Sequence, residues 1–133
     1  MTENEIGKFV VDSAVVVHRE LGPGLLETVY EVILAHELRQ RGLRVERQIP
    51  ISLEFRGIKF DEAFRADIVI EEKVILEIKS IERVTRVHKK QLHTYLRLTR
   101  YKLGFLLNFG EALIKSGITR AVNGLDEPGY LRP

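Results

Sequence analysis

The most constraining feature of the sequence is a pair of apolar segments, residues 64–70 and 74–80, separated by the charged residues 71–73. Two runs rich in β-branched residues around a short polar break predict a β-hairpin. Side chains alternate across a strand, and the second run is largely apolar on both faces, so it predicts a central strand covered by helices on both sides. Glu77 and Lys79 lie within this strand and need an explanation, because charged groups are rarely buried without a partner.

Two explanations of these charges stay open on the residues alone. The first is an ion pair between Glu77 and Lys79 at the end of the strand. The second is a metal site in which Asp67, on the preceding strand, supplies another carboxylate. Directly opposite residues of an antiparallel pair share a face, so Asp67 lies beside Glu77 only if the loop consists of residues 71–73, a common loop length. Two carboxylates about 4 Å apart repel by roughly 4 kcal/mol at an effective dielectric near 20, so this register favours a cation between them.

Asp67 and the segment Glu77-Ile78-Lys79 resemble the core of the PD-(D/E)XK nuclease superfamily, in which an Asp and a (Asp/Glu)-x-Lys on adjacent strands hold magnesium. Ala66 stands where the motif has its nominal Pro, which is not a metal ligand. The resemblance implies hydrolysis of phosphodiesters with Mg²⁺, for which Mn²⁺ can substitute. It also implies that Asp67, Glu77 and the Ile78 carbonyl hold the metal, and that Lys79 positions or activates the attacking water.

A second motif, Gly24-x-x-Glu27-x-x-Tyr30, opens a helix predicted over residues 25–41. Its residues are three apart, so they lie near one edge of the first two turns. The helix dipole favours an acidic residue in the first turn, and this explanation suffices for most helices. The motif resembles the one that names the GxxExxY protein family, a small-domain branch of the same superfamily. This resemblance implies that Glu27 faces the strand carboxylates and binds a second metal or orients the waters of the first.

A third motif, Gln91-x-x-x-Tyr95, lies in a helix predicted over residues 85–100. On composition alone, Tyr95 would be a core residue and Gln91 a surface residue. Its position after the Glu-x-Lys strand resembles the additional motif of the RecB-like branch, which implies that Gln91 contacts the substrate or the catalytic lysine and that Tyr95 shapes the cleft wall. The same helix has a basic face that includes Lys89 and Lys90, which could contact phosphates or remain solvated.

The other elements follow from periodicity and from turn residues. They are a helix over residues 4–21 capped by Thr2 or Asn4, a strand over 43–49 limited by Pro50, a half-exposed strand or hairpin over 51–60 turning near Arg56-Gly57, a doubly covered strand over 103–108, an edge element of ambiguous type over 112–122, and a loose tail over 125–133. This order predicts an α/β domain with a mixed central β-sheet flanked by helices, which agrees with the restriction-endonuclease-like core of the superfamily.

Composition limits the classes of function. A chain of 133 residues is expected to form a single domain over residues 1–133. The absence of cysteine excludes disulfides and thiolate zinc sites and favours the reducing cytoplasm, and the four histidines lack zinc-site spacing. No apolar run approaches the ~20 residues needed to span a bilayer. A net charge of +2 permits a local nucleic-acid-binding patch without requiring one.

Together these features predict a metal-dependent nuclease acting on DNA or RNA. The alternative is a catalytically inert module that keeps the nuclease scaffold and binds nucleic acid or a partner protein, because a fold does not determine a function. The sequence shows no appended recognition domain, so we expect substrate choice to come from the surface, from a homo-oligomer or from a partner.

Overall fold

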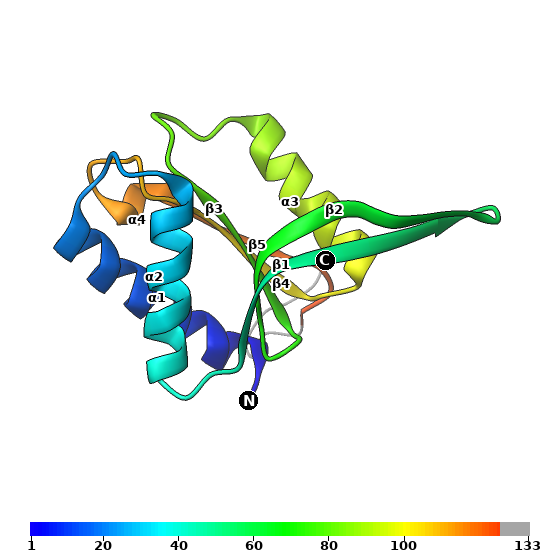
Figure 1. Cartoon of the computed structure of the whole chain (residues 1–133), viewed down its shortest axis with the longest axis horizontal. Coiled ribbons are helices and arrows are strands. Elements are labelled where there is room, and N and C mark those ends of the chain that lie inside the picture. The colour runs from blue at the N-terminus through cyan, green and yellow to red at the C-terminus, as the bar shows by residue number, and fades with distance from the viewer. Residues whose placement is uncertain (126–133) are drawn as a thin grey trace, which may run out of the picture.

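The computed structural model describes residues 1–125, which form a mixed five-stranded β-sheet with helices on both faces (Figure 1). The elements are α1 (Glu3–Leu21), α2 (Glu27–Gln40), β1 (Val45–Phe55), β2 (Ile58–Ile70), β3 (Val74–Lys79), α3 (Arg86–Thr99), β4 (Leu103–Asn108), α4 (Ile114–Gly117) and β5 (Ile118–Val122). The strand order is β1-β2-β3-β4-β5, with β3 and β4 parallel and the other neighbours antiparallel. The predicted α/β class with a mixed central sheet is confirmed. Residues 126–133, which include most of the expected loose tail, lie outside the described part.

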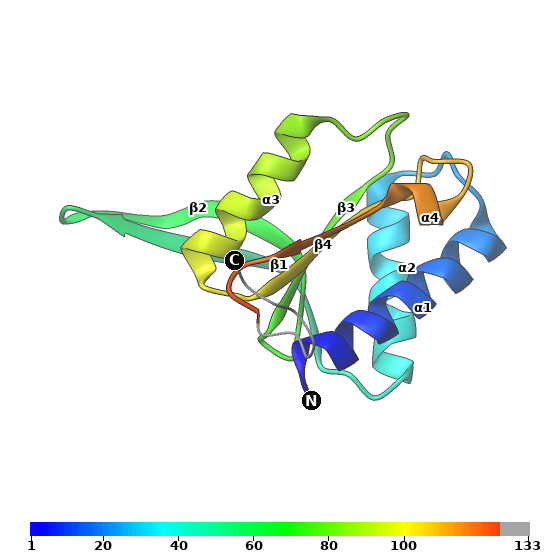
Figure 2. The ribbon, with the colours of Figure 1, turned by 180° about the vertical axis from the view of Figure 1, so that it is seen from behind.

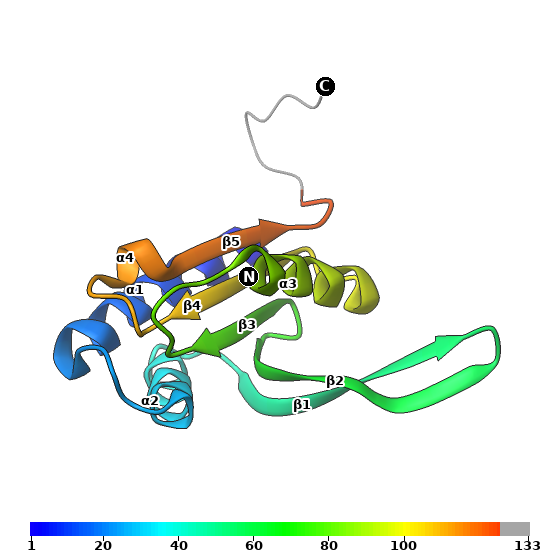
Figure 3. The ribbon, with the colours of Figure 1, turned by 90° about the horizontal axis from the view of Figure 1, so that it is seen from above.

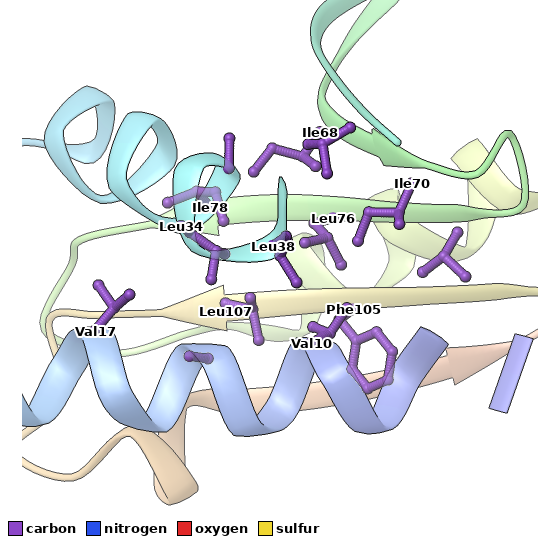
Figure 4. Packing of buried hydrophobic residues seen from close by; sticks show 14 of the residues in the cluster. Val10, Val17, Leu34, Leu38, Ile68, Ile70, Leu76, Ile78, Phe105 and Leu107 are labelled. Atoms are coloured by element: carbon purple, nitrogen blue, oxygen red, sulfur yellow. The ribbon is translucent and has the colours of Figure 1, made fainter. Parts of the chain in front are cut away.

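A hydrophobic core lies on each face of the sheet. Helices α1 and α2 cover one face and α3 covers the other, as Figures 2 and 3 show. On the first face, Val10 of α1 and Leu38 of α2 pack with Leu76 of β3 in one cluster (Figure 4). On the second face, Leu92 and Leu96 of α3 pack against the sheet. Each fully buried aliphatic side chain stabilises the fold by about 1.5–3 kcal/mol. Because β3 has such side chains on both faces, packing on both sides stabilises it, as its apolar pattern predicts.

The ends of α1 follow from its capping residues. Thr2 is the N-cap: its hydroxyl accepts a hydrogen bond from the Glu5 N–H at 3.2 Å, and the Glu5 carboxylate accepts one from the Thr2 N–H at 3.4 Å. This reciprocal pair satisfies two donors that a helix start leaves free. The helix ends at Gly22, whose φ of 72° suits glycine and whose N–H donates to the His18 carbonyl.

The β2–β3 hairpin has the register that the metal-site hypothesis requires. Ile68 pairs with Leu76 and Ile70 pairs with Val74, which leaves residues 71–73 as the turn. The Lys73 N–H donates to the Ile70 carbonyl at 2.9 Å and closes this turn. The predicted three-residue loop is therefore confirmed.

Strands β1 and β2 continue beyond the sheet as a two-stranded extension, residues 49–66, which we call the arm (Figure 1). The prediction of a strand that ends before Pro50 is wrong, because β1 runs through Pro50 to Phe55. β1 is an edge strand, and proline is tolerated there because its missing N–H leaves no internal ladder bond unmade. The predicted turn at Arg56-Gly57 is confirmed; both residues have positive φ, as a tight hairpin turn requires.

Where the arm meets the sheet, β2 twists so that the side chains on one of its faces pass from one core to the other. Gln48 has a left-handed φ of 53° and stands opposite Asp67, and the regular β1–β2 pairing skips this position. On the sheet side, Ile68 belongs to the core under α1 and α2; on the arm side, Ala66 belongs to the core under α3. Asp67 therefore lies where β2 passes from one core to the other.

Asn108 ties the end of β3 to the end of β4. It is fully buried and pairs with Lys79 in the parallel β3–β4 register. Its side-chain oxygen accepts hydrogen bonds from the N–H groups of Ile81 and Gly110, each at 3.0 Å, and its amide donates to the Ile81 carbonyl at 2.9 Å. The chain that follows Lys79 is thereby held in one position.

Replacing Asn108 by Ala is expected to lower the free energy of unfolding by about 3 kcal/mol, because three hydrogen bonds are lost and Ile81 keeps unpaired backbone groups. Urea denaturation measures this loss. Asn123→Ala is the matched control, because that amide makes only long hydrogen bonds of 3.3 and 3.4 Å, and we expect it to cost under about 1 kcal/mol. Equal losses in the two variants would contradict the role assigned to Asn108.

Candidate active site

The two strand carboxylates lie on the same side of the β2–β3 hairpin. Asp67 is half-buried, and its Oδ2 accepts a hydrogen bond from the Ile78 N–H at 2.8 Å. Glu77 is 8% exposed and shares its face of β3 with Ile75, which packs in the core under α3. Burial raises the pKa of Glu77 to about 8, and the negative charge of Asp67 contributes to that rise. The structure therefore brings together the two carboxylates that the sequence pairs.

One oxygen of the Glu77 carboxylate lacks the polar partner that a buried acceptor requires. Its Oε1 is buried and has no hydrogen-bond partner among residues 1–125. A buried acceptor without a partner costs about 1–3 kcal/mol, and more when it is charged. Either a proton or a cation can relieve this cost.

The donor set fits a small divalent cation. Mg²⁺ prefers oxygen ligands and is commonly held by one or two carboxylates together with waters and substrate phosphates. Asp67 and Glu77 supply two such carboxylates, and the orphaned Glu77 oxygen is an available ligand. Within the described residues, no group of three or more His, Asp or Glu side chains is arranged to hold a metal ion. The fit therefore depends on the Asp67 and Glu77 pair.

Lys79 is half-buried at the end of β3, two residues after Glu77. Its positive charge lowers the pKa of Asp67 and of Glu77, although burial raises both overall. Across residues 1–125, Lys79 forms no ion pair within 4.0 Å with either carboxylate. The ion-pair explanation of the strand charges is therefore not observed, and the ammonium group remains available to a water or a substrate.

Asp67 is also held by residues that the sequence analysis did not identify. Gln48 Nε2 donates to Asp67 Oδ1 at 3.4 Å and to Glu31 Oε1 at 2.8 Å. Glu31 is buried in α2 and accepts a charged hydrogen bond from Arg47, with an N–O separation of 2.7 Å. Burial raises the pKa of Asp67, whereas the hydrogen bonds from Ile78 and Gln48 oppose that rise. The hydrogen bond from Gln48 therefore favours the ionised form of Asp67, and Glu31 holds the Gln48 amide in place.

One sequence signal could have identified Glu31. It follows Glu27 by four residues, so both side chains lie on one face of α2, and it stands among buried residues of the same helix. A buried acid at that spacing from a candidate ligand needs a partner. Its partner Arg47 lies on β1, and only the fold brings the two together.

Glu27 is exposed in the first turn of α2. Its negative charge contributes to the raised pKa of Asp67, after the larger effect of burial, so it lies close enough to act on the strand carboxylates. It also lines a cavity of about 640 Å³. The other residues that line this cavity are Gly24, Leu25, Leu26, Thr28, Ser80, Ile81, Glu82 and Gly110. The cavity thus joins the start of α2 to the chain that follows Lys79.

Tyr30, the last residue of the Gly-x-x-Glu-x-x-Tyr motif, fixes the start of α2 that carries Glu27. Tyr30 is fully buried and stacks on Phe109, with ring centroids 4.5 Å apart. Its hydroxyl donates to the Gly22 carbonyl and accepts from the Leu25 N–H. The Ser80 hydroxyl, at the end of β3, donates to the Leu25 carbonyl. Tyr30 therefore anchors the start of α2, and the Ser80–Leu25 hydrogen bond joins it to the end of β3.

Helix α3 places Tyr95 near the carboxylates of Asp67 and Glu77. Its ring stacks on Phe64 of β2, with centroids 3.7 Å apart and an interplanar angle of 1°. Burial raises the pKa of Tyr95, and the charges of Glu77 and Asp67 add to the rise. Gln91 lies four residues earlier and is exposed, and its side chain makes no hydrogen bond to any of residues 1–125.

Comparison with known proteins identifies the superfamily of this chain. The family model of the PD-(D/E)XK nuclease superfamily matches residues 4–121, which include both strand carboxylates and every motif described above. No curated protein and no solved structure matches the chain. In the part of the chain that the structure describes, no helix is long and apolar enough to cross a membrane. The match spans most of the chain, and the sheet has the mixed topology expected of this fold, so the protein belongs to the PD-(D/E)XK nuclease superfamily.

Proposed function

We propose that the protein is a metal-dependent nuclease that hydrolyses phosphodiester bonds in DNA or RNA. The observation that carries this proposal is Glu77: its carboxylate is buried, has a raised pKa and lies beside a second carboxylate. Among residues 1–125, its Oε1 has no hydrogen-bond partner and the nearby Lys79 forms no ion pair. Such a carboxylate is costly for stability, so it points to a function. Membership in a nuclease superfamily supports the same conclusion.

In this proposal, Asp67, Glu77 and the Ile78 carbonyl hold Mg²⁺, or Mn²⁺ in its place. The bound ion supplies a water of lowered pKa and positive charge opposite the reacting phosphate. Lys79 binds or activates the attacking water and offsets the charge that develops on the phosphate oxygens. The Gln48 amide keeps Asp67 oriented toward the ion rather than toward solvent.

Three further residues complete the proposed site. Glu27 binds a second metal ion or orients waters of the first, Gln91 contacts the substrate or Lys79, and Tyr95 forms the cleft wall. The Gly24-x-x-Glu27-x-x-Tyr30 motif supports placing the chain in the GxxExxY branch of the superfamily. The Gln91-x-x-x-Tyr95 motif supports a relation to the RecB-like branch.

The basic face of α3 supports a nucleic-acid substrate. Residues 83–102 contain seven Lys or Arg residues and no Asp or Glu. Lys89 and Lys90 are exposed, and neither forms an ion pair within the described chain. An unpaired cluster of this kind attracts phosphates. The absence of cysteine supports a reducing compartment such as the cytoplasm.

The test is a panel of labelled single-stranded and duplex DNA and RNA, incubated with Mg²⁺, Mn²⁺ or EDTA. We expect cleavage of at least one class with a divalent ion and none with EDTA. An absence of cleavage on every substrate with either ion, together with metal-independent binding, would instead support the inert binding module.

Replacing Gln48 by Ala is expected to lower the cleavage rate and the apparent Mg²⁺ affinity by about 10–100-fold, because it removes the side-chain donor that orients Asp67. Stability should fall by about 1–3 kcal/mol, since the buried Glu31 also loses its hydrogen bond from Gln48, and circular dichroism checks that the variant folds. Metal titrations of cleavage and calorimetry with Mn²⁺ measure these effects. Gln40→Ala, at an exposed glutamine that ends α2, is the control and should match the parent. Unchanged metal affinity in Gln48→Ala would refute the positioning role.

A further inference from the structure

One face of the arm collects apolar side chains along its whole length. Residues 49, 51, 53 and 55 of β1 alternate onto one face, and their partners across the ribbon lie on the same face. The pairs are Ile49 with Ala66, Ile51 with Phe64, Leu53 with Phe60, and Phe55 with Ile58. The arm therefore has one apolar face, and its opposite face carries polar pairs such as Glu54 with Lys59.

The outer part of this face is uncovered. Ile49, Ile51 and Phe64, near the sheet, pack in the core under α3. Farther out, Phe55 is 58% exposed and Phe60 is 51% exposed, and Ile58 is similarly exposed. Contiguous exposed apolar groups of this kind mark interaction sites. The arm projects away from the body of the molecule, so no other element of the described chain covers these side chains (Figures 1 and 3).

The exposed rings are continuous with the active site. Phe64, on the same face of the arm, stacks on Tyr95 of α3. Tyr95 in turn lies close enough to Asp67 and Glu77 for their charges to raise its pKa. A ligand that lies along the arm can therefore extend to the strand carboxylates.

The charges beside the arm indicate what this ligand is. Helix α3 packs over the root of the arm, and the stretch of residues 83–102 is basic and free of acidic residues (Figure 1). The arm itself, residues 49–66, carries three basic and three acidic residues and is neutral. The surface therefore combines exposed aromatic rings on the outer arm with exposed lysines on α3 that form no ion pair among residues 1–125. Proteins bind single-stranded nucleic acid through these two features, by contacts to phosphates and by stacking on bases.

We propose that the apolar face of the arm and the basic face of α3 together bind an unpaired nucleic-acid strand and lead it into the active site. The bases stack on Phe55 and Phe60, and the phosphates follow Lys89 and Lys90. A duplex hides the faces of its bases, so only an unpaired strand can use the aromatic part of this surface. The inference rests on the proposed nuclease function and specifies its substrate class. A second copy of the chain could also cover the arm, but it would leave the unpaired cations of α3 without a role.

The test compares the binding of labelled single-stranded and duplex oligonucleotides, both DNA and RNA, by fluorescence anisotropy in EDTA. The variant Phe55→Leu/Phe60→Leu keeps the arm apolar and removes its rings. We expect it to bind unpaired strands at least roughly tenfold more weakly, with duplex binding changed less than about twofold. A second variant, Phe55→Ser/Phe60→Ser, should show the same selective loss, and circular dichroism checks that both variants fold.

Two further variants isolate the parts of the surface. Leu113→Ser replaces an exposed apolar residue at the start of α4, at the opposite end of the molecule from the arm, and should bind like the parent (Figure 3). Lys89→Glu/Lys90→Glu should weaken binding of both strand types and reduce its salt dependence, because phosphate contacts are lost. Unchanged binding in the lysine variant would overturn the role of α3.

Three outcomes would overturn the role of the arm. The first is an unchanged affinity of both arm variants for unpaired strands. The second is an equal loss of affinity for unpaired and duplex strands. The third is that the parent is a dimer, that the serine variant is a monomer, and that the leucine variant keeps both the dimer and the parent's affinity. The last result, seen by sedimentation, would assign the arm to a second copy. The nuclease proposal is tested separately: it stands if the parent cleaves any substrate with a divalent ion, whatever the arm variants do.

Discussion

The Glu77→Gln variant is expected to lose divalent-dependent cleavage by on the order of a thousandfold or more. The substitution keeps the size of the side chain and removes the charge of the most buried carboxylate proposed as a ligand, so the metal would lose a charged oxygen. Binding of nucleic acid without metal should be unchanged or slightly tighter, because one negative charge is removed from the path of the phosphate. Gel-based cleavage assays and anisotropy measure the two effects.

Glu72→Gln is the matched control for this variant. Glu72 lies in the exposed turn before β3, pairs with Arg44 at the surface, and is not part of the proposed site. Its substitution changes the net charge by the same amount and should leave cleavage within about twofold of the parent, since exposed ion pairs contribute little. Equal activity of the parent and Glu77→Gln would remove Glu77 from the metal site.

The metal-free protein is expected to lose up to roughly 3 kcal/mol of stability between about pH 5 and pH 8. The folded pKa of Glu77 is raised to about 8 from a reference value of 4.5, chiefly by burial. Between these values the folded state keeps a proton that the unfolded state has released, so the free energy of unfolding falls as the pH rises. Below pH 4.5 both states are protonated, and the destabilisation is absent.

Urea denaturation at several pH values in EDTA measures this effect. Glu77→Gln should remove most of the pH dependence and be more stable than the parent near pH 8, because it has no carboxylate to ionise. Mg²⁺ should stabilise the parent most at high pH, where the ionised carboxylate binds it, and should have little effect on the variant. If the stability of the parent does not change over this range, the raised pKa of a buried Glu77 is contradicted.

The parts of the site that could be predicted depend on local rules. The charged residues 71–73 indicated the turn, and the period of two along the strands then placed Asp67 and Glu77 on one face. The central position of β3 followed from its apolar residues on both faces. These inferences needed only neighbouring residues and the geometry of one hairpin.

The parts that could not be predicted depend on long-range contacts. Gln48 and Glu31 act on Asp67 only because β1 returns alongside β2 and α2 packs beside both strands. The sequence does not predict the length of β1, because a proline such as Pro50 interrupts most strands. A strand tolerates proline when it lies at the edge of a sheet, and only the assembled sheet shows that β1 is an edge strand. A pattern of residue types does not specify which strand is outermost.

The left-handed backbone at Gln48 divides β1 and β2 into two independently variable parts. On the sheet side, the pairing of Ile68 with Leu76 sets the register of Asp67 and Glu77 without any contribution from the arm. Insertions, deletions or sequence changes in the exposed outer part of the arm, residues 53–60, are therefore expected to leave the position of Asp67 relative to Glu77 unaltered. Under the proposed function, a change of length or sequence in residues 53–60 alters which strands the arm binds and leaves the proposed metal site unchanged, so this outer part is a site for grafting a new specificity.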